Sequence, residues 1–169
     1  MAVFFLDRTP ELCAEYIADR HLNKTILFTI SALSTAHRLL DGIEYKEVYD
    51  DPHLVKRRWK LHDRRDTIME HAKMINRPIV RWMRESLSNY NWGADYLLGM
   101  FNEYNYRFDK SHKKISLCWI LGIPPSNIID YDITPPFLDE IETMRVAYKT
   151  SSLSKMNRWT KRDMPAWMV

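Results

Sequence analysis

The strongest constraint on the fold is a helical pattern that runs through residues 16–42 and ends at Gly42. From Arg20 onward, apolar residues recur at steps of three, four or seven, as on the buried stripe of a half-exposed helix. They are Leu22, Ile26, Ile30, Leu33 and Leu40. Glycine is a natural C-terminal stop for such a helix. We therefore expect the rest of the chain to pack around this helix.

Length and composition favour a single domain. The 169 residues are 46% hydrophobic and include only four glycines, which is typical of a globular, helix-rich chain rather than a disordered one. The sequence contains no internal repeat and no long linker. We expect an all-α fold over residues 1–169, a single-domain helical bundle of about five to seven helices with a short extended N-terminal arm.

The expected elements follow from periodicity, caps and prolines. Thr9 and Pro10 begin the first helix, which breaks near Arg20, and Ser88 caps the most regular helix of the chain. In order, we expect an arm or strand at 1–6, a helix at 10–19, the organising helix, a loop at 43–52, and helices at 53–75, 79–86, 88–108, 110–121 and 137–148.

The sequence also suggests a compartment. Cys13 and Cys118 are too few for a disulfide framework, so we expect buried free thiols in a reducing environment. No apolar run approaches the roughly 18 residues of a membrane span, and no signal peptide is evident. These features predict an intracellular protein without a membrane partner.

Positive charge is segregated along the chain, although the formal net charge is only +3. Residues 56–65 and 143–162 are strongly basic, whereas acids collect between residues 130 and 142. Such segregation favours a surface that faces a polyanion such as DNA, although two solvated helix faces would look the same. The candidate nucleic-acid-binding residues are Lys56, Arg57, Arg58, Lys60, Arg64, Arg65, Arg158, Trp159, Lys161 and Arg162.

The C-terminal segment has two interpretations. Basic residues beside Trp159 suit recognition of a single strand or a flipped base, through phosphate contacts and stacking. Equally, Pro165 and Trp167 could pin the tail to the body of the protein.

A second line of residues follows the organising helix. His21, Lys24 and Phe28 are spaced at i, i+3 and i+7, so they fall within roughly 60° of one another around the helix.

This segment carries a resemblance. Residues 18–22, Ala-Asp-Arg-His-Leu, and their helical continuation resemble the phage endonuclease V family, the small all-helical pyrimidine-dimer DNA glycosylases. In scattered blocks over most of its length, the chain also resembles phage proteins that have a His-x-x-Lys helix near the N-terminus. Those proteins end in a Trp-x-Lys-Arg-x-x-Pro-x-Trp-like motif, matched here by residues 159–167.

The resemblance to the glycosylases implies a covalent mechanism. Removal of Met1 would expose the α-amine of Ala2, which could form a Schiff base with a deoxyribose C1′. The catalytic candidates are Ala2, His21 and Lys24. The alternatives without catalysis are that His21 hydrogen-bonds the backbone at the start of the helix and that Lys24 is a solvated surface lysine.

The family's catalytic glutamate falls at Phe28 in this sequence. Its arginines fall at Leu27 and Ser31. Because general acid–base chemistry needs a titratable partner, Glu15 or Asp19 would have to replace the glutamate.

A metal or cofactor is not expected. Helical spacing could bring together Asp63, Asp66 and Glu70 with the flanking His62 and His71, as in a hard-cation or zinc site. Interleaved basic residues favour ion pairs within a helix instead. The sequence has no glycine-rich phosphate loop, no Cys-x-x-Cys motif and no nucleophile elbow.

We therefore expect a DNA-binding protein with a DNA glycosylase/AP-lyase-like fold that acts on damaged or modified bases in duplex DNA. The protein either retains a hydrolase or lyase activity in DNA repair or has lost it. The second alternative arises because Phe28 occupies the position of the family's catalytic glutamate. The alternative is a non-catalytic phage protein that binds DNA, a modified nucleotide or a host protein. A third possibility is an enzyme that acts on a free modified nucleotide.

Overall fold

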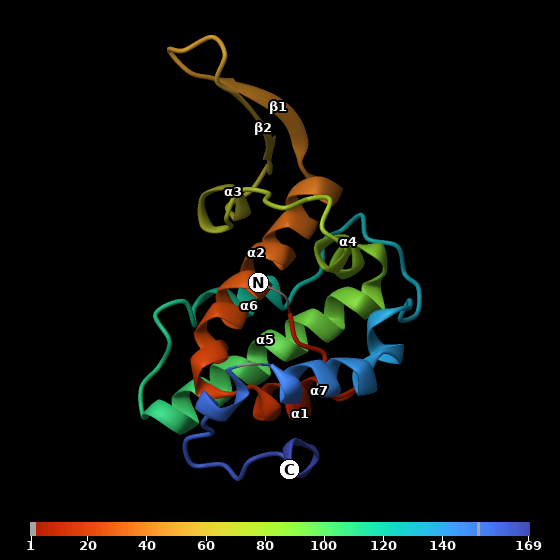
Figure 1. Ribbon diagram of the computed structural model, residues 1–169. Coiled ribbons are helices and arrows are strands. Elements are labelled where there is room, and N and C mark those ends of the chain that lie inside the picture. The colour runs from red at the N-terminus through yellow and green to blue at the C-terminus, as the bar shows by residue number, and fades with distance from the viewer. Residues whose placement is uncertain (1–2, 152) are drawn as a thin grey trace.

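The computed structural model describes residues 3–151 and 153–169, and these are mostly helical (Figure 1). The α-helices are α1 (Pro10–Tyr16), α2 (Asp19–Asp41), α3 (Arg65–Ile68), α4 (Pro78–Glu85), α5 (Leu87–Phe108), α6 (Leu117–Leu121) and α7 (Ile141–Thr150). Short 3-10 helices are η1 (Phe137–Asp139), η2 (Ser154–Met156) and η3 (Ala166–Met168). Strands β1 (Ile43–Val48) and β2 (Val55–Lys60) form an antiparallel hairpin. The fold is therefore mainly helical, as predicted, but not purely all-α.

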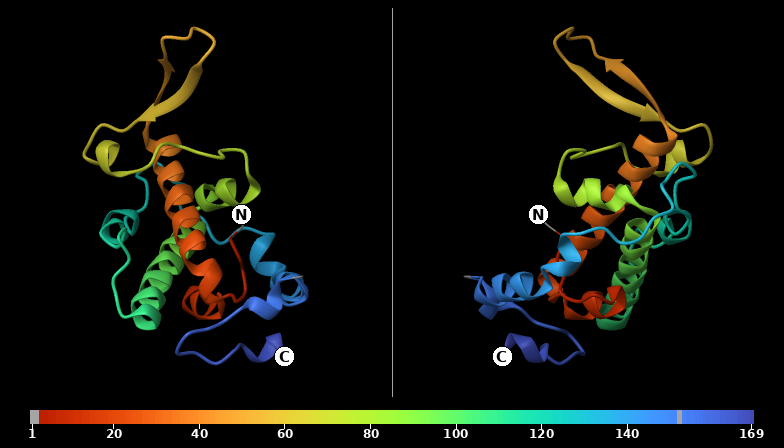
Figure 2. Two further views of the ribbon diagram at one scale, coloured as in Figure 1. Left: turned by 60° about the vertical axis from the view of Figure 1, so that its left-hand side comes forward. Right: turned by 90° about the vertical axis from the view of Figure 1, so that its right-hand side faces the viewer.

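The organising helix is confirmed as α2. It packs on α4 and α5, and α5 also packs on α1, so that α2 and α5 form the centre of the molecule (Figures 1 and 2). The helix ends as predicted, because Gly42 N–H donates to the carbonyl oxygen of Arg38 at 2.9 Å. The break before α2 lies at Ile17 and Ala18 rather than near Arg20.

The long helix predicted at 88–108 is confirmed as α5, but its predicted cap was wrong. Ser86 is the N-cap, and its Oγ accepts a hydrogen bond from Asn89 N–H at 3.1 Å. Ser86 has an extended backbone and Ser88 is already inside the helix, where its hydroxyl cannot serve as the cap.

The expected N-terminal arm is extended over residues 3–6. Phe5 is buried, and its ring lies 5.3 Å from Trp82, 4.9 Å from Trp92 and 5.2 Å from Phe137 between centroids. This aromatic cluster joins the arm to α4, α5 and η1.

The helix predicted at 53–75 was wrong, and so was the loop predicted at 43–52. Both regions contribute to the hairpin, in which Ile43 pairs with Lys60 and Val48 with Val55. After the hairpin, only α3 is helical before α4. The predicted helices at 110–121 and 137–148 are also shorter or shifted, at Leu117–Leu121 and at Ile141–Thr150 after η1.

A buried arginine explains why residues 59–70 are not one helix. Arg38 is 1% exposed and donates to the carbonyl oxygens of Trp59 at 2.9 Å and Met69 at 2.8 Å. It also donates to the carbonyl oxygens of Asp66 and Glu70 and to the Asp66 carboxylate. In a continuous helix most of these carbonyls would accept helical N–H groups instead. The hydrogen bonds to the Arg38 guanidinium therefore prevent residues 59–70 from forming one continuous helix.

Cys13 is a buried free thiol, as expected, whereas Cys118 is a free thiol that is only half-buried. Among the residues that the structure describes, no helix is long and apolar enough to cross a membrane. In the same residues, no group of three or more His, Cys, Asp or Glu side chains is placed to hold a metal ion.

Candidate functional site

His21 lies at the start of α2, against the N-terminal arm and α7. Its Nδ1 is 2.6 Å from the hydroxyl of Tyr148, and its ring centroid is 5.1 Å from that of Phe4. The Tyr148 oxygen also accepts a hydrogen bond from Ala18 N–H at 3.0 Å, which leaves its hydrogen and one lone pair for the contact with Nδ1. When the phenol donates to Nδ1, the neutral imidazole carries its hydrogen on Nε2.

The protonation state of His21 follows from its surroundings. Burial, with the nearby charges of Arg20 and Lys24, lowers the pKa of His21 to about 4. The ring is therefore neutral at pH 7 and can donate a hydrogen bond from Nε2, but it is a weak base at neutral pH.

The structure brings only part of the predicted catalytic set together. Phe4, in the arm, contacts His21, so the beginning of the described chain runs beside the imidazole. Lys24 is exposed one turn further along α2. Ala2 lies outside the described residues.

The position of the family's glutamate is occupied by a packed side chain. Phe28 is 7% exposed, and the guanidinium of Arg77 lies 5.9 Å from its ring centroid. Leu27 is exposed and Ser31 is buried.

Glu15 and Asp19, the two acids that could replace the family's glutamate, contact other residues instead of His21. Glu15 lies 3.6 Å from the guanidinium of Arg162. Asp19 accepts from the backbone and hydroxyl of Thr160 and forms an ion pair with Arg107. Neither carboxylate is placed as the acid–base partner of His21.

The first basic segment forms strand β2 and the turn before α3, and its hairpin projects from the helical body (Figure 1). Arg57 and Arg58 pair across the hairpin with Glu44 at 2.7 Å and Glu47 at 2.9 Å. Lys60 is exposed, like Lys56, which lies 5.6 Å from the ring centroid of Tyr49. Part of this charge is thus already compensated within the hairpin.

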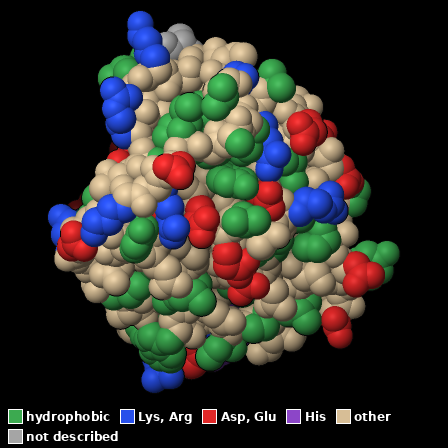
Figure 3. Space-filling model, turned by 90° about the horizontal axis from the view of Figure 1, so that it is seen from below, with side chains coloured by type: hydrophobic (Ala, Val, Ile, Leu, Met, Phe, Trp, Pro, Cys, Tyr) green, Lys and Arg blue, Asp and Glu red, His purple; other side chains and the backbone are tan. Residues whose placement is uncertain are grey.

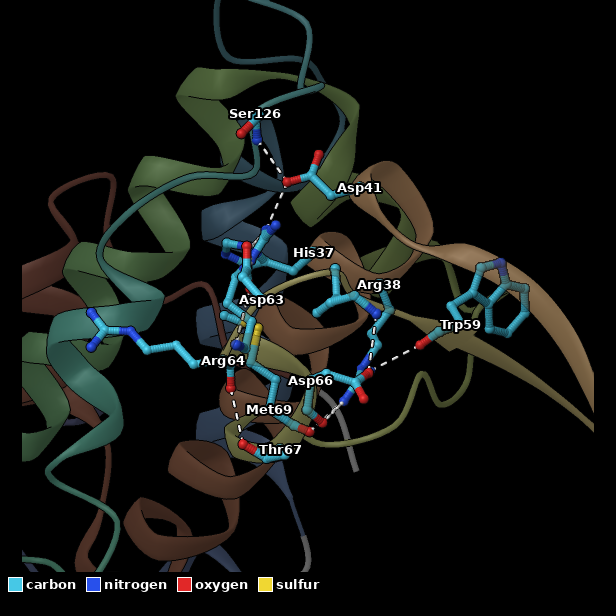
Figure 4. A network of polar contacts seen from close by, with 12 residues as sticks. His37, Arg38, Asp41, Trp59, Asp63, Arg64, Asp66, Thr67, Met69 and Ser126 are labelled. Atoms are coloured by element: carbon cyan, nitrogen blue, oxygen red, sulfur yellow. Dashed lines mark hydrogen bonds and ion pairs between the residues drawn. The ribbon is translucent and has the colours of Figure 1, made fainter.

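Arg64 and Arg65 have different surroundings. The guanidinium of Arg64 lies 4.5 Å from the ring centroid of Trp119, which is 50% exposed. Arg65 donates to Asp41 at 2.7 Å, Asp63 at 2.9 Å and Nδ1 of His37 at 2.9 Å. Figure 4 shows His37 and Asp41 turned into this network and Arg64 pointing away from it.

The network continues into the core. His37 is 1% exposed, and its Nε2 lies 2.7 Å from the hydroxyl of Tyr90. Tyr90 in turn donates to the carbonyl oxygen of Leu121 at 2.6 Å. The Tyr90 hydrogen is therefore committed, so His37 must donate from Nε2 and accept from Arg65 at Nδ1. Burial and the charge of Arg65 lower the pKa of His37 to about 4.

The second basic segment begins in α7, and its last residues belong to the tail that loops beneath α1 and α5, at the end of the molecule opposite the hairpin (Figure 1). Arg162 pairs with buried Glu103 at 2.6 Å and Lys161 with Asp109 at 2.6 Å. Trp159 is 9% exposed, and its indole N–H donates to the carbonyl oxygen of Tyr16 at 2.9 Å. On this lower face, basic and acidic side chains are interspersed (Figure 3).

These contacts favour the tail as a structural strap. The ring of Trp167 lies 5.8 Å from that of Tyr16 and 5.3 Å from the Arg145 guanidinium, so the tail is pinned against α1 and α7. Arg158 is exposed and donates to backbone carbonyls of its own segment. The two basic segments do not form one surface.

Sequence reasoning missed two groups that could serve binding. One is the exposed indole of Trp119 beneath Arg64. The other is the pair Asn23 and His112, whose side chains meet at 2.7 Å although 89 residues separate them. A ring or an amide of this kind has no local signal, because its neighbours come from distant parts of the chain.

No family model, curated protein or solved structure matches this chain.

Proposed function

We propose that the protein binds DNA, and that the β1–β2 hairpin is the element that contacts it. The observation that carries this proposal is a projecting two-stranded ribbon (Figure 1). Its exposed cations are Lys46 on β1 and Lys56, Arg57 and Lys60 on β2. A two-stranded antiparallel ribbon fits the major groove of B-DNA.

The distribution of ion pairs indicates which cations of the hairpin region are available to contact DNA. Among the described residues, no carboxylate forms an ion pair with Lys46, Lys56, Lys60 or Arg64, in contrast to Arg57 and Arg58. Unpaired cations gain most from phosphate, because each contact releases condensed counterions without breaking an existing pair. The register places Lys56 and Lys60 on one face of the ribbon and Lys46, which pairs with Arg57, on the other. The proposed interface therefore depends on Lys56, Lys60 and Arg64 and is largely independent of sequence.

Exposed aromatic rings support the same surface. Tyr45 is 43% exposed on β1, and Trp119 lies under Arg64, which is in the turn that follows β2. Rings interleaved with cations suit contacts to sugars and bases.

The test is fluorescence anisotropy of a labelled duplex as a function of salt, with the double variant Lys56→Gln/Lys60→Gln. The slope of log K against log salt should decrease in magnitude by about two, because each lost phosphate contact removes about 0.9. Lys149→Gln/Lys155→Gln, on α7 and η2, is the matched control and should leave the slope unchanged. Equal effects of the two double variants would refute the hairpin as the contact.

A base-excision or lyase activity is the second candidate. It is favoured by the position of the arm, since Phe4 lies against His21. Borohydride should then trap a covalent adduct with abasic duplex, and a substitution of Lys24 should reduce its yield. Absence of an adduct at saturating protein would remove this activity and leave the DNA-binding proposal in place.

The packed Phe28 favours the non-catalytic version. With the pKa of His21 lowered by burial and with Glu15 and Asp19 bound elsewhere, no described acid–base pair is placed for the chemistry. We therefore propose DNA binding without base excision as the primary function.

A further inference from the structure

A cavity of about 830 Å³ lies at the other end of α2 from the hairpin. Its walls come from the start of α2, the last turns of α5 and residues 110–113, which lie together in Figure 1. This volume is in the range of cavities that hold small organic ligands. The DNA-binding proposal makes no use of it.

A buried histidine orients the amide of Asn23 at the wall of this cavity. Lys114 N–H donates to Nδ1 of His112 at 3.0 Å, so the hydrogen of the neutral ring is on Nε2. Nε2 is 2.7 Å from the Asn23 side chain and must therefore face its amide oxygen. Burial, together with the charges of Lys113 and Lys114, lowers the pKa of His112, which keeps the ring neutral.

As a consequence, the Asn23 amide presents its two N–H donors away from His112. His112 itself is only 3% exposed, so the orientation is set by a rigid neighbour. Asn23 lines the cavity, and none of the described residues accepts a hydrogen bond from its Nδ2 in the structure. The wall thus offers a fixed donor pair.

The charge of the cavity is positive. Lys110 and Lys113 line it and are exposed, and no described carboxylate forms an ion pair with either. Asp19, the acid in the lining, is already bound to the buried guanidinium of Arg107 at 3.1 Å and to Thr160. Two ammonium groups therefore remain for an anion.

The remaining wall is aromatic. Tyr104 and Phe108 meet edge to face, with ring centroids 5.0 Å apart, and Tyr104 also contacts the ring of His112 at 4.9 Å. Both side chains line the cavity and are half-buried. They supply a flat apolar surface beside the donors.

We propose that this cavity binds a 5′-phosphorylated nucleoside. Lys110 and Lys113 hold the phosphate, which carries close to two negative charges at neutral pH, and Tyr104 contacts the ring of the base. Asn23 donates to an oxygen of the phosphate or of the base. The same chemistry is offered by a free mononucleotide and by the phosphorylated 5′ end of a single strand.

Binding is tested with the full chain by calorimetric titration of the four 2′-deoxynucleoside 5′-monophosphates. Thymidine and inorganic phosphate are titrated in parallel, because neither carries both halves of the proposed ligand. At least one monophosphate should bind about tenfold or more tightly than either half, since one charged hydrogen bond changes affinity by such a factor. Inorganic phosphate binding as tightly as every nucleotide would overturn the proposal, and so would no binding of either a nucleotide or a 5′-phosphorylated oligonucleotide.

A short oligonucleotide with and without a 5′-phosphate distinguishes the two sources of the ligand. Tight binding of a mononucleotide identifies the free nucleotide, and binding of the phosphorylated strand alone identifies the strand end. Both results support the site.

Matched variants locate the ligand. Asn23→Asp keeps the acceptor for His112 but replaces the donors with negative charge, so nucleotide binding should be lost while the thermal midpoint changes little. Lys110→Gln/Lys113→Gln should weaken binding about tenfold or more. Lys56→Gln/Lys60→Gln removes equal charge from the hairpin and should leave nucleotide binding unchanged. If Asn23→Asp and Lys110→Gln/Lys113→Gln both bound nucleotide like the unaltered chain, the cavity would be excluded, whatever the outcome for duplex DNA.

Discussion

Replacement of Arg38 by methionine tests whether one buried guanidinium holds the hairpin on the body. Arg38 connects α2 with the end of β2, with α3 and with the segment after it, through carbonyl oxygens of Trp59, Asp66, Met69 and Glu70. Methionine has similar length but donates no hydrogen bond. The variant therefore removes every donor and leaves most of the packing volume.

The expected loss of stability is large. Hydrogen bonds from a charged group contribute about 1.5–3 kcal/mol each, but a loosened segment regains part of this from water. The Asp66 side chain is 33% exposed, which makes such hydration accessible. We therefore expect a decrease of about 3–5 kcal/mol in the free energy of unfolding, as for other broken buried charge networks. For a chain of this size this corresponds to a decrease of roughly 10 °C in Tm.

Urea unfolding gives the free energy, and amide hydrogen exchange shows where it is lost. Protection should decrease over residues 43–77 and remain in α5, because Arg38 contacts the former and not the latter. Arg38→Lys keeps the charge but not the planar fork of donors, so its free energy of unfolding should lie between those of the unaltered chain and of Arg38→Met. A decrease within the roughly 0.5 kcal/mol typical of surface substitutions, or a uniform loss of protection, would refute the role assigned to Arg38.

Three further predictions follow from buried groups. Folding lowers the pKa of His37 to about 4 from 6.5, so the stability that depends on the neutral ring is fully present above pH 6.5 and is lost as pH falls toward 4. Urea titrations should show that the free energy of unfolding decreases by about 3 kcal/mol between these pH values, and by less in His37→Gln. Tyr148→Phe removes the partner of His21 Nδ1 and should cost about 1–2 kcal/mol in chemical denaturation, while the near-ultraviolet spectrum retains its tertiary signal. Gly93→Ala places a Cβ against Sδ of Met83 in the core and should lower stability by about 1–3 kcal/mol in thermal unfolding; an unchanged Tm would mean that Met83 moves aside at no cost.

The helical core could be predicted because its signal is local. The stripes of α2 and α5 repeat every three or four residues, and that repeat alone defines a helix with one buried face. The cap of α5 was misplaced because both Ser86 and Ser88 carry a suitable hydroxyl. The choice depends on the extended backbone of Ser86, which tertiary packing sets.

The hairpin was missed because the residues that define it act across the fold. Its cross-strand ion pairs join Arg57 to Glu44 and Arg58 to Glu47, over 13 and 11 residues. Read in order, the acids belong to one short polar stretch and the arginines to another, so neither stretch shows a strand pattern by itself.

The same separation explains why the charge of a basic segment does not show which of its cations are free of ion pairs. A count of arginines and lysines along the chain ignores the carboxylates that pair with them in space. Arg162 is bound to Glu103, 59 residues away, whereas Lys60 meets no described carboxylate at ion-pair distance. Affinity for phosphate depends on this difference, because a paired cation must first give up its partner. The charge on which the DNA-binding proposal depends is therefore a property of the folded hairpin, and the variants of Lys56 and Lys60 test that proposal directly.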